Sequence, residues 1–135
     1  MAGDENTIAQ TYSNYVQAFQ TLDRRAVLPY CHVPCMFVSP QGVRIMVTPS
    51  EVESLFNRVM ESLKARGFAQ SWLTDFEVKQ MSEDIALVSV SRVRYKTDGS
   101  ELEQLGETYT FRKTEKDWKI VAAMVHDPDT VLRLC

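Results

Sequence analysis

Hydrophobic residues in the first third of the chain recur at helical spacing. Apolar side chains stand three or four positions apart at Ile8, Tyr12, Tyr15, Val16, Phe19 and Leu22. This period predicts an amphipathic helix over residues 6–21. Residues 24–31, which carry further apolar positions, predict a second and shorter helix.

A third helix is specified by its start, its apolar stripe and its end. In "TPSE", Thr48 suits the N-cap, Pro49 suits the first helical position, and Glu51 completes a capping box. The stripe that follows consists of Val52, Leu55, Phe56, Val59, Met60 and Leu63. Gly67 predicts the end of this helix.

The remaining segments alternate apolar and polar residues with a period of two, which predicts strands. "CMFVS" and "VRIMV" flank the turn sequence "PQG" and predict a hairpin. Four longer strands are predicted at residues 71–81, 85–97, 105–113 and 118–126. Their short connections, including Asp98-Gly99, predict an antiparallel meander.

Helices gathered early and strands gathered late indicate an α+β fold, in which three N-terminal helices cover a curved antiparallel sheet. The 135 residues suit a single domain spanning 1–135. The strand over 85–97 would run ~40 Å if it were straight, so in a domain of this size it must curl. A curled sheet closed by helices leaves a tapering cavity, and concave apolar cavities are where small ligands bind.

Composition narrows the classes of function. Hydrophobic residues make up 44% of the chain, charged residues 24%, and the net charge is −3. Lys and Arg form no basic stripe, so we expect no nucleic-acid partner. No apolar run reaches the ~18–20 residues of a membrane span, and the polar start "MAGDENT" does not resemble a signal peptide. We therefore expect a cytoplasmic protein without membrane contact.

The cysteines and glycines give no sign of a metal or cofactor site. Three cysteines are an odd count and are interpreted as reduced thiols. "CHVPC" places Cys31, His32 and Cys35 together, but a structural zinc site needs four ligands, and only His126 and Cys135 remain. Five scattered glycines form no phosphate-binding loop. We expect neither metal nor cofactor.

The order of elements, with "SPQG" after the first strand and "DWKIV" opening the last, resembles the nuclear-transport-factor-2-like superfamily. That group includes ketosteroid isomerases, SnoaL-type cyclases and scytalone dehydratases, and the resemblance covers nearly the whole chain. It implies a cone-shaped, cystatin-like α+β barrel. It also implies a homodimer that forms through the outer face of the sheet.

The stretch from Tyr15 to Gly42 is similar to the ketosteroid isomerases without a gap. Tyr15 falls on their catalytic tyrosine, and Ser39 falls on the aspartate that serves as general base. A serine hydroxyl cannot take up a proton near neutral pH as a carboxylate does, so that proton transfer should be absent. The second oxyanion donor of these enzymes aligns near Thr108, and strand alternation then points Glu107 to the opposite face.

Alternatives remain open at several positions. Tyr15 is either a hydrogen-bond donor into the cavity or a core tyrosine whose hydroxyl is satisfied at the rim. His126 shares a face with Met124 by alternation, and is either an acid–base group or a residue that simply ends its strand. Arg92 and Arg94 face either the cavity, where they could bind an acidic ligand, or the outer surface.

Three functions follow from this sequence. The first is a SnoaL-like protein that binds a small hydrophobic molecule without efficient catalysis. The alternative is an isomerase, cyclase or dehydratase that uses Tyr15 with His126. A further alternative is a protein-partner-binding module, which would have a filled cone. The expected ligand-binding residues are Tyr15, Phe19, Phe37, Ser39, Met60, Thr108, Met124 and His126.

Overall fold

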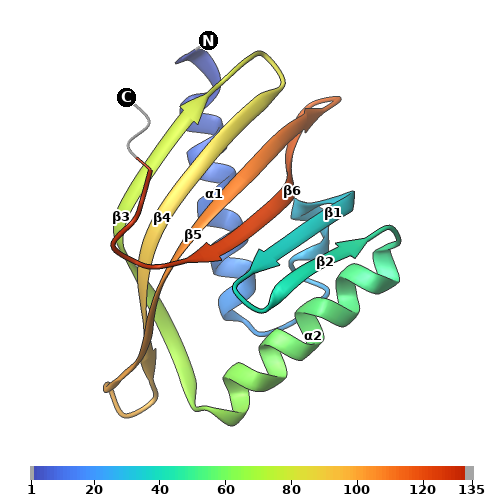
Figure 1. Ribbon diagram of the computed structural model, residues 1–135. Coiled ribbons are helices and arrows are strands. Elements are labelled where there is room, and N and C mark those ends of the chain that lie inside the picture. The colour runs from blue at the N-terminus through green and yellow to red at the C-terminus, as the bar shows by residue number, and fades with distance from the viewer. Residues whose placement is uncertain (1, 133–135) are drawn as a thin grey trace.

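A computed structural model describes residues 2–132 of the chain. Within these residues a six-stranded sheet is accompanied by two α-helices, α1 (Glu5–Gln20) and α2 (Pro49–Ala65) (Figure 1). The strands are β1 (Cys31–Ser39), β2 (Gly42–Met46), β3 (Phe68–Gln80), β4 (Ile85–Lys96), β5 (Glu101–Thr114) and β6 (Asp117–His126). Every predicted strand is present, and the α+β class is confirmed.

The strands lie in the order β2-β1-β6-β5-β4-β3. Strands β3 to β6 form the predicted antiparallel meander. Strand β1 pairs antiparallel with β2 but parallel with β6, so the sheet is mixed and not wholly antiparallel. The parallel pair arises because the chain leaves the β1–β2 hairpin, passes through α2 and builds the meander before β6 returns beside β1.

The prediction of a helix over residues 24–31 is wrong. This segment contains only a 3₁₀ turn, Leu28–Tyr30, and Cys31 is already extended at the start of β1. Pro29 lies inside the turn and has no backbone N–H to donate. A segment this short also gains too few hydrogen bonds to offset the cost of helix nucleation.

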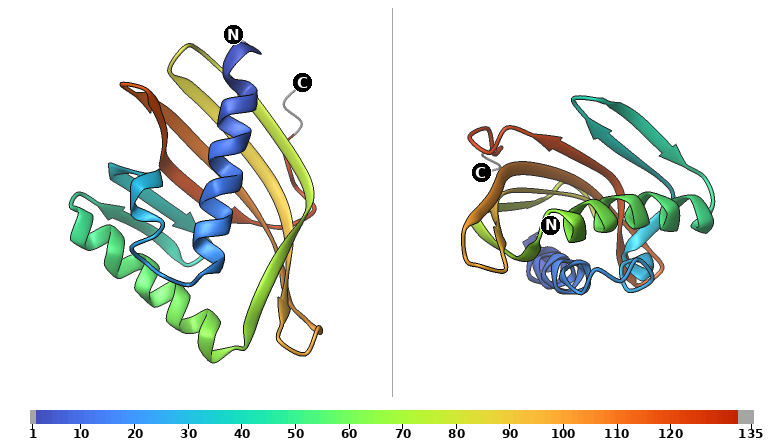
Figure 2. Two further views of the ribbon diagram at one scale, coloured as in Figure 1. Left: turned by 180° about the vertical axis from the view of Figure 1, so that it is seen from behind. Right: turned by 90° about the horizontal axis from the view of Figure 1, so that it is seen from below.

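The long helices begin and pack as their sequences indicate. The Thr48 side chain accepts a hydrogen bond from the Glu51 N–H at 3.2 Å, a cap that stabilises α2 by about 1 kcal/mol. Gly67 follows α2 with a left-handed φ of 83°. Figure 2 shows α1 lying along one face of the curved sheet, which we call the inner face, while α2 runs beside β1 and β2.

The main core lies between α1 and the inner face of the meander. Its buried side chains include Ile8, Tyr12, Met60, Val88, Val90, Tyr109 and Phe111. On β5, inward residues alternate with Thr108 and Thr110, which face the opposite side of the sheet. That opposite side is called the outer face.

A β-bulge in β6 reverses which of its residues face the core. The register with β5 passes from Phe111 opposite Ile120 to Thr110 opposite Ala122, which leaves Val121 as an extra residue. Ahead of this bulge the even-numbered positions face inward, and beyond it the odd-numbered positions do. The last part of β6 therefore turns its even-numbered side chains to the outer face.

After β6 the chain crosses the outer face of the sheet (Figure 1). The backbone N–H of Leu132 donates to the Ser89 hydroxyl at 3.1 Å, which helps to bury Ser89 on that face. Neither helix of residues 2–132 has the length and apolar character needed to cross a bilayer. The cytoplasmic location expected from the sequence stays a prediction.

Candidate functional site

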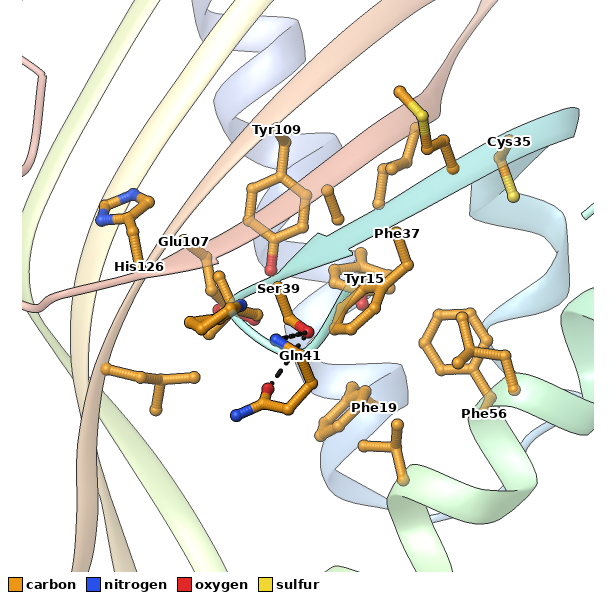
Figure 3. A pocket seen from close by; sticks show the side chains of 18 of the residues that line it. Tyr15, Phe19, Cys35, Phe37, Ser39, Gln41, Phe56, Glu107, Tyr109 and His126 are labelled. Carbon is orange, nitrogen blue, oxygen red and sulfur yellow. Dashed lines mark hydrogen bonds between the residues drawn. The ribbon is translucent and has the colours of Figure 1, made fainter. Parts of the chain in front are cut away.

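A cavity of about 460 Å³ lies between the inner face of the sheet and the two helices (Figure 3). Its walls come from α1, β1, α2, β5 and β6, together with the turn between β1 and β2. The volume falls within the range of ordinary small-molecule sites, which is roughly 300–1,000 Å³. The cavity is therefore large enough to hold a ligand of a few fused rings.

Aromatic rings form much of its wall. The ring centroids of Tyr15 and Tyr109 are 6.0 Å apart, and those of Phe19 and Phe56 are 6.2 Å apart, both in edge-on arrangements. Phe37 on β1 adds a further ring. Tyr15 and Phe19 share a face of α1 because they are four residues apart. Edge-on packing of this kind holds the rings in fixed positions.

A buried ion pair lies behind this wall. Arg92 on β4 donates from Nε to Oε1 of Glu107 on β5 at 2.7 Å, and the two side chains are 5% and 12% exposed. The same guanidinium donates to the hydroxyls of Tyr12 and, at 3.3 Å, Ser71. Glu107 also lines the cavity, so one carboxylate borders both the core and the ligand space. A buried charge pair is tolerated when its hydrogen bonds are satisfied in this way.

Burial controls the protonation of the groups around this pair. Burial by itself lowers the pKa of Arg92, but the carboxylate of Glu107 and the neighbouring phenols of Tyr12, Tyr109 and Tyr15 together outweigh this effect and raise the pKa above its ordinary value. Burial raises the pKa of Tyr12, Tyr15 and Tyr109. The three phenols are thus neutral near pH 7 and keep a proton that they can donate in a hydrogen bond.

A second ion-paired group borders the cavity. Glu103 accepts from Nη1 of Arg94 at 2.7 Å and from Nη2 of Arg66 at 2.5 Å. Burial acts to raise the pKa of Glu103, but the hydrogen bonds from Arg66 and Arg94 outweigh it and lower that pKa. Arg92 and Arg94 both face inward, which decides the question left open by the sequence. Each is already paired with a carboxylate of the chain itself.

Ser39 lies at the end of β1 and lines the cavity beside the turn to β2. Its hydroxyl accepts from the backbone N–H of Gln41 and donates to the Gln41 side chain, both at 3.2 Å (Figure 3). The serine therefore presents a hydroxyl, and not a carboxylate, at this edge of the cavity.

Of the eight expected ligand-binding residues, four line the cavity, three do not, and His126 reaches only its edge. The cavity is lined by Tyr15, Phe19, Phe37 and Ser39. Met60 is 2% exposed and packs in the core instead. Thr108 and Met124 lie on the outer face, so the structure does not place them against a ligand. Thr108 is outside because β5 turns Glu107 inward, and Met124 is outside because the bulge at Val121 shifts the alternation.

His126 reaches the edge of the cavity at the end of β6, but its ring lies on the outer face. Its Nε2 is 2.8 Å from the Thr108 hydroxyl, and its Nδ1 is 2.9 Å from the carbonyl oxygen of Asp127. Figure 3 shows the imidazole turned away from Tyr15 and Tyr109. The structure therefore does not bring Tyr15 and His126 together around one point.

Glu107 and Tyr109 are among the cavity residues that sequence reasoning missed, and a signal for them was present. In "LGETYTF", Leu105, Tyr109 and Phe111 alternate with small or polar residues. Because large apolar residues of a half-buried strand face the core, this alternation places Glu107 on the inner face with them. Alignment with the isomerases pointed to Thr108, one residue away, and so to the wrong face.

Cys31 and Cys35 also line the cavity, as free thiols. Burial raises the pKa of Cys31 to about 12 and raises the pKa of Cys35 as well. Both are neutral thiols near pH 7 and poor nucleophiles. Cys135 lies outside the described residues. Within residues 2–132, His, Cys, Asp and Glu side chains form no group of three that could hold a metal ion.

Solved structures share this architecture. An NTF2-like protein of unknown function from Pseudomonas putida KT2440 matches with a TM-score of 0.77 at 13% identity, over 93% of this chain and 87% of that one. An NTF2-like protein with a cystatin-like fold from Novosphingobium aromaticivorans matches at 0.74 and 17%, over 91% and 80%. A ketosteroid isomerase-like protein from Erwinia carotovora atroseptica SCRI1043 matches at 0.70 and 17%, over 93% and 96%. At these identities the likeness shows the fold.

No curated protein sequence matches the chain. A family model described as NTF2-like protein (DUF6841) matches residues 4–128, which is nearly the whole length. The match agrees with the curved sheet, the helices on its inner face and the cystatin-like fold of the similar structures. The chain belongs to this family of NTF2-like proteins (DUF6841).

Proposed function

We propose that this protein binds a small, largely apolar molecule in its cavity and does not transfer protons in the manner of a ketosteroid isomerase. One observation carries the proposal: the cavity of about 460 Å³ is open and bordered by Ser39, the residue that the resemblance aligns with the base of the isomerases. The ring-lined walls favour an aromatic or alicyclic ligand. The hydroxyl of Ser39 leaves that position without a group that takes up a proton.

The energetics of burial support this proposal. A two-ring ligand buries about 250 Å² of apolar surface, which at about 25 cal/mol per Å² gives roughly 6 kcal/mol before the entropy of association is subtracted. That term alone corresponds to an affinity in the tens of micromolar range. Binding of higher affinity would require hydrogen bonds at the polar side of the cavity.

The alternative functions have less support. An isomerase, cyclase or dehydratase that uses Tyr15 with His126 requires both groups near the reacting atoms, but the His126 ring lies on the outer face beside Thr108. A partner-binding module with a filled cone is disfavoured by the open cavity. Ligand binding without this chemistry is the function that the described residues support best.

Two neighbouring alanines on β6 allow a matched test. Ala123 lines the cavity, whereas Ala122 faces outward opposite Thr110. We expect wild-type protein to bind 2-naphthol saturably in isothermal titration calorimetry. Ala123→Phe should weaken binding at least about tenfold because the new ring fills the cavity, while Ala122→Phe should bind as wild type does. Equal binding by both variants, each with a native circular dichroism spectrum, would contradict the proposal.

We also propose that two copies of the chain associate through the outer face, as the resemblance implies. Support comes from apolar side chains exposed there on three neighbouring strands. They are Val43 and Ile45 on β2, Met36 on β1 and Met124 on β6, with exposures of 58%, 66%, 39% and 42%. Covering them with a second copy would remove a contiguous apolar surface from water.

A further inference from the structure

We propose that Glu107 selects the ligand, so that the cavity takes an apolar ring system bearing a hydrogen-bond donor, such as a hydroxyl or amine, and rejects a carboxylate. This inference deepens the proposed function and rests on it. It begins from the unusual position of Glu107, a carboxylate in a wall otherwise rich in aromatic rings. Such a group strongly constrains what can lie against it.

The Glu107 side chain retains acceptor capacity on its cavity side. A carboxylate has two oxygens that together accept about four hydrogen bonds. Oε1 receives Nε of Arg92 at 2.7 Å. Among the described residues, every side-chain oxygen that is shielded from solvent has a hydrogen-bond partner. Because Glu107 lines the cavity, its second oxygen can accept a hydrogen bond from a bound molecule.

The guanidinium of Arg92 is held by partners within the chain through each of its three nitrogens. Arg92 donates from Nε to Glu107, from one terminal nitrogen to Ser71 and from the other to Tyr12. Arg94 is likewise engaged by Glu103. The charged side chains that line the cavity are Arg94, Glu103, Glu107 and Asp127, so an entering ligand meets more negative than positive charge.

This arrangement favours one class of polar group over its opposite. A hydroxyl or amine on the ligand donates to Glu107 and satisfies an acceptor that binding would otherwise strip of water. A carboxylate on the same ring would bring like charges together in a poorly screened site. Sites built to pair with a ligand hydroxyl discriminate strongly against the analogue that lacks it. The phenol of Tyr109, two residues along the same face, points into the same space (Figure 3).

Three naphthalenes of similar size test the inference on wild-type protein. We expect 2-naphthol to bind at least about tenfold more tightly than 2-methoxynaphthalene, in which the donor is lost, and 2-naphthoate to bind most weakly. Calorimetric titration at neutral pH measures all three. Equal affinity for naphthol and its methyl ether, or tightest binding of naphthoate, would overturn the inference and leave ligand binding intact. Absence of binding by all three would overturn the proposed function as well.

Paired variants assign the effect to Glu107. Arg92→Met combined with Glu107→Leu removes both charges together, so that neither is left buried alone. We expect this double variant to bind naphthol and methoxynaphthalene equally. Glu53→Gln, at the exposed ion pair with Arg24 away from this cavity, should keep the wild-type preference. Persistence of that preference in a folded double variant would exclude Glu107 as its source. If the double variant does not fold, the comparison of the three naphthalenes on wild-type protein decides the inference.

Discussion

The side chains of Arg92 and Glu107 meet diagonally across β4 and β5, with Nε 2.7 Å from Oε1 and both groups nearly enclosed by protein. This contact joins the hydrophobic core, through Tyr12, to the wall of the cavity. The pair therefore has two consequences: it affects stability, and it sets the polarity of the ligand site.

Removing one member of this pair should be costly. Arg92→Met leaves the Glu107 carboxylate buried without its cation, and we expect the free energy of unfolding to fall by about 3–5 kcal/mol. Urea denaturation followed by circular dichroism measures the change. Adding Glu107→Leu to the same variant should recover much of the loss, because no isolated charge remains.

An exposed pair provides the comparison. Nε of Arg24 lies 2.8 Å from Oε2 of Glu53 on the surface, and these side chains are 43% and 29% exposed. Arg24→Met should move the urea midpoint far less than Arg92→Met does, because water solvates the carboxylate that remains. Equal effects of the two substitutions would show that the buried pair has no special role.

Stability should decline at alkaline pH because of the buried tyrosines. Burial raises the pKa of Tyr12, Tyr15 and Tyr109 above the ordinary value of 10.0. The stability that these three tyrosines contribute is fully present below pH 10, and it is lost as the pH rises towards their pKa values in the folded protein. Each should lower the free energy of unfolding by about 1.4 kcal/mol per pH unit above 10. Urea denaturation over a pH series measures this slope.

The variant Tyr15→Phe should show a smaller alkaline slope than wild type, because one titrating group is gone. Tyrosinate absorbance in the near ultraviolet provides an independent measure, and we expect it to rise together with the loss of tertiary circular dichroism. Stability that stays constant above pH 10 would contradict the assignment of these phenols to the core.

The thiol of Cys31 should resist alkylation in the folded protein. Burial raises its pKa from 9.0 to about 12, and only the thiolate reacts with iodoacetamide. The rate at mildly alkaline pH should therefore be roughly a thousandfold below that of an unfolded cysteine. Peptide mapping by mass spectrometry, with and without urea, gives the rate for each cysteine separately. Comparable rates in both conditions would mean that the thiol is accessible.

A charge on the outer face should prevent self-association. Ile45→Lys places an ammonium group within the exposed apolar surface of β2, and we expect it to convert a dimer to a monomer in sedimentation velocity. Arg44→Ala, on the opposite side of the same strand, is the control and should remain dimeric. Wild-type protein that sediments as a monomer at all concentrations would disprove the dimer proposal.

Local patterns predicted most of the secondary structure. The capping sequence around Thr48 and the apolar stripe after it specify α2, because caps and side-chain periodicity act within one or two turns. The strands were likewise visible from their alternation. The helix expected over residues 24–31 was wrong because apolar spacing there is shared by a 3₁₀ turn that leads directly into β1.

The sequence by itself determined the α+β order of elements, the positions of the long helices and the presence of each strand. These features depend on near neighbours in the chain. Only the tertiary structure decided which side chains border the cavity. The bulge at Val121 turns His126 outward, and the pairing of β4 with β5 brings Arg92 to Glu107. Both depend on strand register, which is set by contacts between residues far apart in sequence.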